Sequence, residues 1–171
     1  MNCPFCKNGN YDGADVCEHC GESLDFLSHP SVSSNLETSL LRDRVAAIMD
    51  SEPVVVGPAR RVRDVLDLLV DSATGCVVIV ETDRIVGVFT ERDALLRLNT
   101  SAAALGERAI CDFMTPSPET VTDDAEIAFA LHKMDIGGYR HLPVVCEGKL
   151  AGVISTHAIF QYIGSHLTAT E

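Results

Sequence analysis

The segment MDSEPVVVGPARRVRDVLDLLVDSATGCVVIVETDRIVGVFTERD (49–93) recurs as MTPSPETVTDDAEIAFALHKMDIGGYRHLPVVCEGKLAGVISTHA (114–158). The two copies align without a gap at an offset of 65 residues (114 minus 49), so that Met49 corresponds to Met114 and Gly87 to Gly152. An internal repeat of this length indicates two copies of one supersecondary unit. Most of the chain is therefore expected to be built twice on the same plan.

Each copy begins with a short extended stretch that is followed by an amphipathic helix. The apolar positions of these helices recur at i, i+3, i+4 and i+7, the spacing of one helix face; they are Val62, Val65, Leu66 and Leu69 in the first copy and Ile127, Ala130, Leu131 and Met134 in the second. Helical spacing over Thr38–Met49 predicts a further helix that leads into the repeat. Asp123 and Glu126 are candidates for a capping box at the start of the second-copy helix.

Two strands and a closing helix complete each copy. The strand candidates are Cys76–Val80 and Ile85–Phe89 in the first copy, and Leu142–Cys146 and Leu150–Ile154 in the second. Turn-forming residues separate the strands of each pair, which predicts two β-hairpins. Closing helices are expected from about Glu91 and about Thr156. The order is β-α-β-β-α, twice, and the predicted class is α+β (α/β-like).

The composition restricts the partners that this chain can bind. A net charge of -12 over 171 residues argues against binding to the phosphate backbone of nucleic acid or to an anionic lipid surface. The sequence has no apolar run of about 18 residues and no apolar signal segment, so no membrane span and a cytoplasmic location are expected. Three of the seven cysteines (Cys76, Cys111 and Cys146) lie in or beside apolar stretches and are expected to be small buried hydrophobes.

Two Cys-x-x-Cys pairs stand at the N-terminus, Cys3-Pro-Phe-Cys6 and Cys17-Glu-His-Cys20. Four convergent thiolates suit a tetrahedral Zn²⁺ ion, and in so short a segment metal binding would supply the folding energy. A rubredoxin-like iron site and a labile redox dithiol are the alternatives. Because of these two Cys-x-x-Cys pairs, residues 1–26 resemble the short zinc-ribbon family of prokaryotic proteins. The polar, Ser-rich segment 27–39 is expected to be a flexible linker.

The repeat itself resembles a tandem pair of cystathionine-β-synthase (CBS) domains, the Bateman module. The stretches that carry the resemblance are Ile48-Met49, Gly87–Asp93 and Arg140–Val145. The resemblance implies CBS domains at about 40–100 and 107–168, with two clefts between them. It also implies pairing of such modules into homodimers, and an adenine nucleotide (AMP, ADP or ATP) or S-adenosylmethionine as regulatory ligand.

The nucleotide motif of that family is Gly-h-x-[Ser/Thr]-x-x-Asp, where h is apolar. The first copy contains it in full, with Thr90 and Asp93, whereas the second copy has Ser155 but Ala158 in place of the aspartate. The resemblance assigns the aspartate to the ribose hydroxyls, and the hydroxyl residue to a helix start where free N–H groups favour phosphate. A methyl group cannot accept those hydrogen bonds, so only the cleft over the first-copy motif is expected to bind nucleotide.

The resemblance also implies a basic pair from the opposite copy near the phosphates. Here that pair is Arg140 and His141, while the equivalent first-copy residues, Gly75 and Cys76, carry no charge. Arg92 is a further candidate at the phosphate end. The adenine is expected against the extended stretch of the first copy, with Pro53, Val54 and Val56 as candidate contacts.

Simpler interpretations of the same residues remain open. Thr90 and Asp93 also form the pattern of a capping box, and an isolated Arg140 is typical of a solvated turn. The cluster Arg60, Arg61 and Arg63 is expected to be a solvated helix face. The favoured function is a nucleotide-sensing regulatory module that acts in trans on another protein. The alternative is an iron or redox ribbon protein with the repeat as a dimerisation scaffold, and no arrangement of side chains predicts an enzyme.

Overall fold

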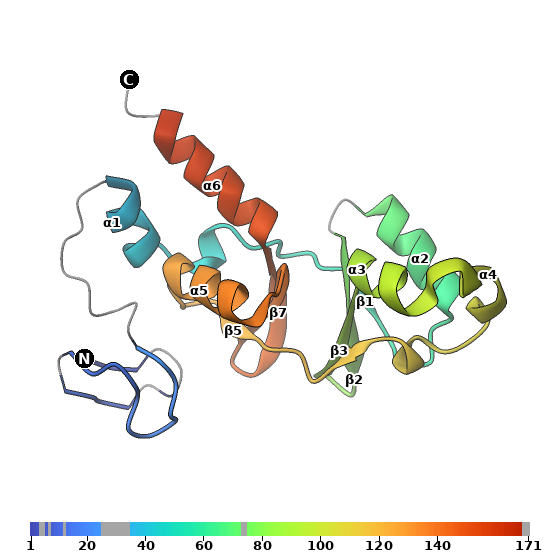
Figure 1. Ribbon diagram of the computed structural model, residues 1–171, viewed down its shortest axis with the longest axis horizontal. Coiled ribbons are helices and arrows are strands. Elements are labelled where there is room, and N and C mark those ends of the chain that lie inside the picture. Colours follow the sequence, from blue (N-terminus) through green and yellow to red (C-terminus); the bar gives the residue numbers. More distant parts are fainter. Residues whose placement is uncertain (4–5, 7, 12, 25–34, 73–74, 169–171) are drawn as a thin grey trace. The chain divides into compact units, whose positions relative to one another are not determined.

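The computed structural model describes residues 1–3, 6, 8–11, 13–24, 35–72 and 75–168. The chain divides into two compact units. Figure 1 shows its helices and strands, coloured along the sequence. The first unit contains Met1–Ile48, Asp124–Tyr139 and the residues from Thr156 onward, and the second contains Met49–Asp123 and Arg140–Ser155. Among the described residues, no helix has the length and apolar character needed to cross a bilayer.

The second unit contains a four-stranded sheet from the first copy, in the order β1-β2-β3-β4. Its strands are β1 (Val55–Val56), β2 (Cys76–Glu81), β3 (Arg84–Thr90) and β4 (Thr115–Pro116). Strand β1 runs parallel to β2, and the other neighbouring pairs are antiparallel. Helix α2 (Val62–Asp71) connects β1 to β2, which confirms the first half of the predicted order.

Helix α2 packs its apolar face into the core of this sheet. Val62, Val65 and Leu69 are buried and Leu66 is partly buried, as the periodicity predicted. The buried cluster that they join is almost entirely aliphatic; its other members are Val56, Val77, Ile79, Phe89, Leu98, Ile110 and Phe113. The core of the first copy therefore extends past the closing helix, as far as the segment before β4.

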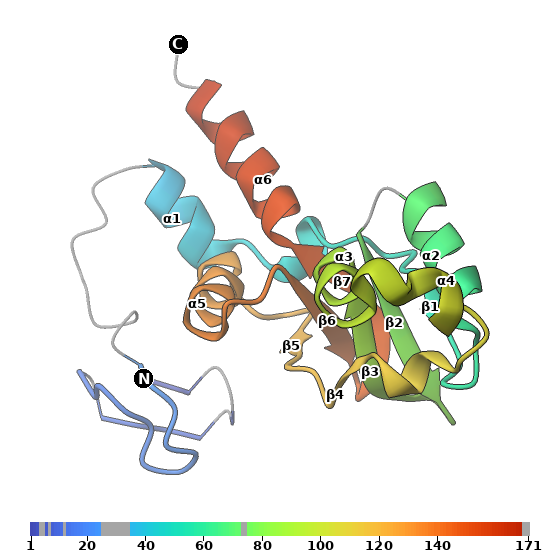
Figure 2. The same ribbon diagram turned by 45° about the vertical axis from the view of Figure 1, so that its right-hand side comes forward.

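The second copy repeats the register of the first. Its sheet comprises β5 (Val121–Thr122), β6 (His141–Cys146) and β7 (Lys149–Ser155), in that order. The pair Val121↔Val144 is the equivalent of Val56↔Ile79 in the first sheet. Each hairpin has a register irregularity at the same place, and each closes with two residues of positive φ, the geometry that matches strand twist in tight turns. Strand β3 contacts β7, and Figure 2 shows both sheets of this unit.

The segments that begin the two copies are exchanged between the two sheets. Strand β4, at the start of the second copy, pairs with β3 of the first through Val88↔Thr115. Asp50, at the start of the first copy, forms the equivalent bridge with Val153 of β7. The backbone approaches closely at Gly152, where a Cβ atom would lie 2.4 Å from the Asp50 carbonyl oxygen. The sequence patterns did not predict this exchange.

The closing segments of the two copies differ. In the second copy, α6 (Thr156–Thr168) is one continuous helix. In the first copy, the short helix α3 (Glu91–Asp93) continues into a π-helical segment, η3 (Ala94–Leu98). Three short helical segments follow it, namely η4 (Asn99–Ser101), α4 (Ala102–Leu105) and η5 (Ile110–Asp112).

The first unit groups three helices beside the short η2 (Val45–Ala47). They are α1 (Asn35–Arg42), α5 (Ile127–Gly137) and α6, and each contacts the other two. The Tyr162 hydroxyl on α6 donates a hydrogen bond to the Asp43 carboxylate, just after α1. The predicted linker 27–39 lies outside the described residues up to position 34, and its last residues belong to α1.

Three local predictions were wrong. The lead-in helix begins before Thr38 and ends at Arg42, because the backbone of Val45 donates to the Ala125 carbonyl instead of continuing the helix. Glu126 caps α5 without a side-chain hydrogen bond, and the Asp123 N–H donates to Val145, so the predicted capping box is absent.

The third error concerns the cysteines. Cys76 is buried as expected, but Cys111 and Cys146 are exposed. Cys146 ends β6 beside the hairpin turn, and Cys111 lies in the short helix η5. Apolar neighbours in the sequence were a poor guide at these two places: Cys146 ends its strand at the turn, and in η5 the buried residue is Ile110.

Candidate functional site

The Thr90–Asp93 pair forms a complete capping box at the start of α3. The Thr90 N–H and hydroxyl donate to Asp93 Oδ2 at 3.0 and 2.8 Å, and the Asp93 N–H donates to Thr90 Oγ1 at 3.3 Å. The simpler interpretation of the motif, a capping box, is therefore confirmed. Because the cap already uses two backbone N–H groups, the helix start has fewer free donors for phosphate than expected.

The other oxygen of the Asp93 carboxylate is bound from outside the motif. Thr115 of β4 donates its hydroxyl to Oδ1 at 3.0 Å, and Arg97 Nε lies 3.3 Å from the same atom. The Asp93 side chain is only 13% exposed. Neither Arg97 nor Thr115 was among the predicted site residues, since both lie outside the Gly-h-x-[Ser/Thr]-x-x-Asp pattern.

Arg97 connects the closing segment of the first copy to β4, the strand at the start of the second copy. Its guanidinium donates to the carbonyl oxygens of Phe113 (3.0 Å) and Met114, and to Thr115 Oγ1 at 3.0 Å. Together with Asp93 and Thr115 it forms a polar cluster, which we call the Asp93 clamp. The clamp holds β4 against the turn that carries the nucleotide motif.

Cys76 and Gly75 border the motif on the other side. Cys76 pairs with Thr90 across β2 and β3. Burial, with a further contribution from the negative charge of Asp93, raises the pKa of the Cys76 thiol to about 12. A Cβ atom at Gly75 would lie 3.4 Å from the carboxyl carbon of Glu91. In the first copy the position equivalent to Arg140 thus faces a negative charge, which disfavours phosphate there.

The predicted basic pair stands at the equivalent place in the second copy. His141 begins β6, is half-buried and pairs with Ser155, while Arg140 precedes the strand and is exposed. Both belong to the same compact unit as Thr90 and Asp93. Arg92 is exposed on α3. The approach of these three basic side chains to a phosphate remains a prediction.

The extended stretch that was expected to contact adenine is only partly a strand. Pro53 and Val54 are half-buried and precede β1, and the Val54 carbonyl accepts a hydrogen bond from the Val78 N–H at 2.9 Å. The Val56 side chain belongs to the hydrophobic core, whereas the Val55 side chain is exposed. Any contact of Val56 with a ligand is therefore limited to its backbone.

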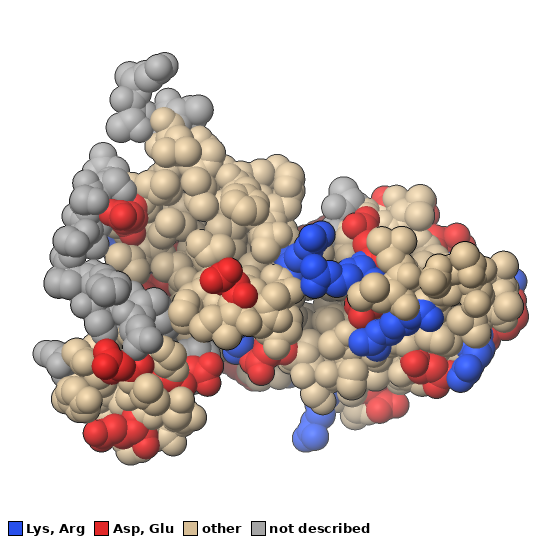
Figure 3. All heavy atoms as spheres, in the orientation of Figure 1, with Lys and Arg blue, Asp and Glu red and all other residues tan. Residues whose placement is uncertain are grey.

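Arg60, Arg61 and Arg63 form ion pairs on the surface with Asp64 and Glu107. This confirms that they belong to a solvated face. On the face drawn in Figure 3, Lys and Arg side chains gather around α3, while the described part of the N-terminal ribbon shows Asp and Glu side chains.

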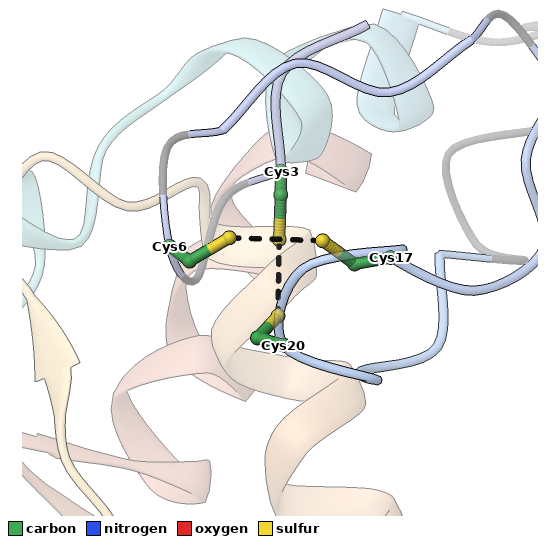
Figure 4. A group of neighbouring side chains, drawn as sticks. All are labelled: Cys3, Cys6, Cys17 and Cys20. Carbon is green, nitrogen blue, oxygen red and sulfur yellow. Dashed lines mark hydrogen bonds between the residues drawn. The ribbon is translucent and has the colours of Figure 1, made fainter.

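The four N-terminal cysteines converge on one point (Figure 4). Their Sγ atoms all lie within 4.8 Å of one another, with separations of 3.7 Å for Cys3–Cys20 and 3.6 Å for Cys6–Cys17. For Zn–S bonds of about 2.3 Å, the edges of a sulfur tetrahedron measure about 3.8 Å. The sulfur positions therefore fit a tetrahedral metal ion.

Two small hairpins position these sulfurs. The isolated bridges Asn2↔Gly9 and Val16↔Ser23 close them. Cys3 and Cys17 are buried in a small core that they form with Ala14 and Leu24. His19, between Cys17 and Cys20, is exposed.

The thiols in this cluster cannot all ionise without a cation. Burial acts to raise the pKa of Cys17, but N–H groups of Cys20 and His19 stabilise its thiolate and bring the pKa down to about 6. For Cys20, the Glu22 N–H favours the thiolate, yet burial and the neighbouring sulfurs outweigh it and raise the pKa to about 12. A bound cation would remove this repulsion, so the donor set fits a metal ion.

Comparison with known proteins agrees with this architecture. The family model for the CBS domain matches residues 45–100 and 110–165. The CBS domain-containing protein CBSCBSPB1 of Arabidopsis thaliana is 30% identical over 137 residues, which cover 76% of this chain and 25% of that protein. This chain thus spans about a quarter of that relative.

Solved structures show the same fold. CBSX2, solved in complex with AMP, is 27% identical with a TM-score of 0.61, and the match covers 75% of this chain and 98% of that one. The CBS domain pair of MJ0100, solved with 5′-methylthioadenosine and S-adenosyl-L-methionine, gives a TM-score of 0.63 at 20% identity, over 72% of this chain and 97% of that one, and supports the fold alone. The family match covers well over half of the sequence, and the chain belongs to the family of proteins with paired CBS domains.

Proposed function

We propose that this protein is a non-catalytic regulatory module that binds an adenine nucleotide in one cleft of its CBS pair. The observation that carries the proposal is that the motif is complete in only one copy. Ser155 of the second copy corresponds to Thr90, but Ala158 stands at the position of Asp93 and carries no carboxylate. The AMP complex of CBSX2, 27% identical to this chain, supports an adenosyl ligand. Arg140, His141 and Arg92 are proposed to lie near the phosphate, and the backbone of residues 53–56 near the adenine.

Titration calorimetry with AMP, ADP, ATP and S-adenosylmethionine tests this proposal. We expect one site per chain. Asp93→Ala should weaken binding by about 100-fold or more, because two ribose hydroxyls lose a charged acceptor. The variant also loses the capping box, so circular dichroism must first show that it is folded. Heat from none of these ligands with the wild-type protein would refute the nucleotide site.

The ribbon is proposed to hold one structural Zn²⁺ ion through Cys3, Cys6, Cys17 and Cys20. The sulfur separations near those of a tetrahedral site support it. Elemental analysis of protein purified without added metal should give one zinc per chain and no visible absorption. Iron with strong visible absorption would instead favour the alternative, an iron or redox ribbon with the repeat as a scaffold.

Homodimerisation through the CBS pair and action on another protein in trans complete the proposal. Leu95 and Leu96, just after the nucleotide motif, are each 75% exposed, which is unusual for two adjacent leucines. Replacement of both by glutamate should convert a dimer into a monomer in sedimentation experiments. A wild-type protein that is monomeric at the highest soluble concentration would contradict the dimer.

A further inference from the structure

The Asp93 carboxylate is already engaged at both of its oxygens. Oδ2 accepts hydrogen bonds from the Thr90 N–H and hydroxyl, which fill two of the roughly four lone-pair positions of a carboxylate. Oδ1 accepts a hydrogen bond from the Thr115 hydroxyl and forms an ion pair with Arg97 Nε at 3.3 Å. An incoming ribose hydroxyl must therefore compete with these groups for the Asp93 oxygens.

Thr115 is the donor that leaves at least cost. The Thr90 bonds are local to the cap, because donor and acceptor are three positions apart in the sequence. Arg97 is held in place by its bonds to Phe113, Met114 and Thr115. The Thr115 hydroxyl, by contrast, can rotate away from Oδ1 and still accept the hydrogen bond from Arg97 at 3.0 Å.

We propose that Thr115 and Arg97 are positioning residues that set the affinity of Asp93 for ribose, with the Thr115 hydroxyl occupying the place of a ribose hydroxyl. The inference rests on the proposed nucleotide site and deepens it. Binding replaces the Thr115–Asp93 bond by a ribose–Asp93 bond and so loosens β4 from the Asp93 clamp. Because β4 lies at the start of the second copy, ligand binding is coupled to the connection between the copies.

The second copy has no equivalent of the clamp. The residues at the positions of Asp93, Arg97 and Thr115 are Ala158, Tyr162 and Asp50. Tyr162 instead donates to Asp43, and the Asp50 carboxylate accepts from the Glu52 N–H at 2.9 Å. The coupling is therefore a property of the first copy.

Thr115→Val tests the inference, since valine keeps the shape and removes the hydroxyl, and Thr115→Ser is the matched control. We expect Thr115→Val to bind AMP about 3- to 10-fold more tightly by calorimetry, the effect of removing one competing hydrogen bond. Thr115→Ser should match the wild type within about two-fold. Equal or weaker binding by Thr115→Val, with the wild type still binding, overturns this inference alone. Binding by none of the three proteins overturns the proposed function with it.

Amide hydrogen exchange gives a second readout at Ser117, whose N–H donates to the Val86 carbonyl beside β4. Without AMP, the Ser117 amide should exchange faster in Thr115→Val than in Thr115→Ser, because the clamp has lost a bond. With saturating AMP the difference between the two rates should become smaller, since the Thr115–Asp93 bond is then absent from both proteins and only the bond from Arg97 to the residue-115 hydroxyl still distinguishes them. A difference that is as large with AMP as without it would contradict displacement by ribose.

Discussion

The two copies of the repeat have the same strand register and the same two-residue hairpins, yet they differ in the polar residues that surround the closing helix. In the first copy Asp93 gathers donors from its own turn and from β4. In the second copy the methyl side chain of Ala158 cannot accept a hydrogen bond, and the closing helix continues unbroken to Thr168. The shared apolar pattern sets the fold of both copies, whereas the difference between them lies in a few polar positions.

Moving the aspartate from one copy to the other is the strongest test of this difference. The double variant Asp93→Ala/Ala158→Asp should bind AMP about 100-fold or more weakly than the wild type. The restored motif beside Ser155 would face Gly75 and Cys76, which supply no positive charge. Calorimetry measures the loss, and the single variant Ala158→Asp serves as control because it keeps the first-copy site. Wild-type affinity in the double variant would show that the motif alone makes a site.

The two equivalent glycines should differ in their tolerance of a side chain. A Cβ atom at Gly152 would meet the backbone oxygen of Asp50 at 2.4 Å, whereas at Gly87 it would meet the flexible side chain of Met114. We expect Gly152→Ala to lower the free energy of unfolding by about 3 kcal/mol and Gly87→Ala by about 1 kcal/mol. Urea denaturation measures both free energies of unfolding. Equal losses would contradict the prediction, because they would mean that the Asp50 backbone moves aside as easily as the Met114 side chain.

The smallest effect concerns Cys76, whose second-copy equivalent is His141. The folded protein keeps the Cys76 proton up to a pKa of about 12, while the unfolded chain releases it near pH 8.5. The folded state therefore binds more protons in this window, and stability falls as the pH rises through it. Between pH 8 and pH 10, Cys76→Ala should lose less stability than the wild type in urea denaturation. Cys146→Ala, at an exposed cysteine, is the control. If the stability of Cys76→Ala depended on pH in the same way as that of the wild type, the raised pKa of Cys76 would be contradicted.

Much of the architecture was predictable because it depends on periodic patterns. The helix faces around Val62 and Ile127 and the paired strands each repeat over several residues, so the order β-α-β-β-α followed from them. The four ribbon cysteines were predictable for another reason, since metal-ligand spacing is local. The capping box of Thr90 and Asp93 also lies within one turn of helix.

The parts that were missed involve short elements and distant contacts. Strand β4 has two residues, which is too few for a periodic pattern, and the Asp50 bridge has one. Thr115 lies 22 residues from Asp93, so no local pattern connects them. The Asp93 clamp could therefore be recognised only from the folded structure and not from the sequence.

The exchange of the segments that begin the two copies has a consequence for how the chain can be divided. Asp50 completes a sheet that belongs to the second copy, and β4 completes a sheet that belongs to the first. A cut between the copies, for example within Asn99–Ser101, would therefore separate each sheet from an edge that the other fragment carries. It follows that the two fragments should be unstable apart and should complement each other when mixed. Covalent fusion turns this association into an intramolecular one that no longer depends on protein concentration.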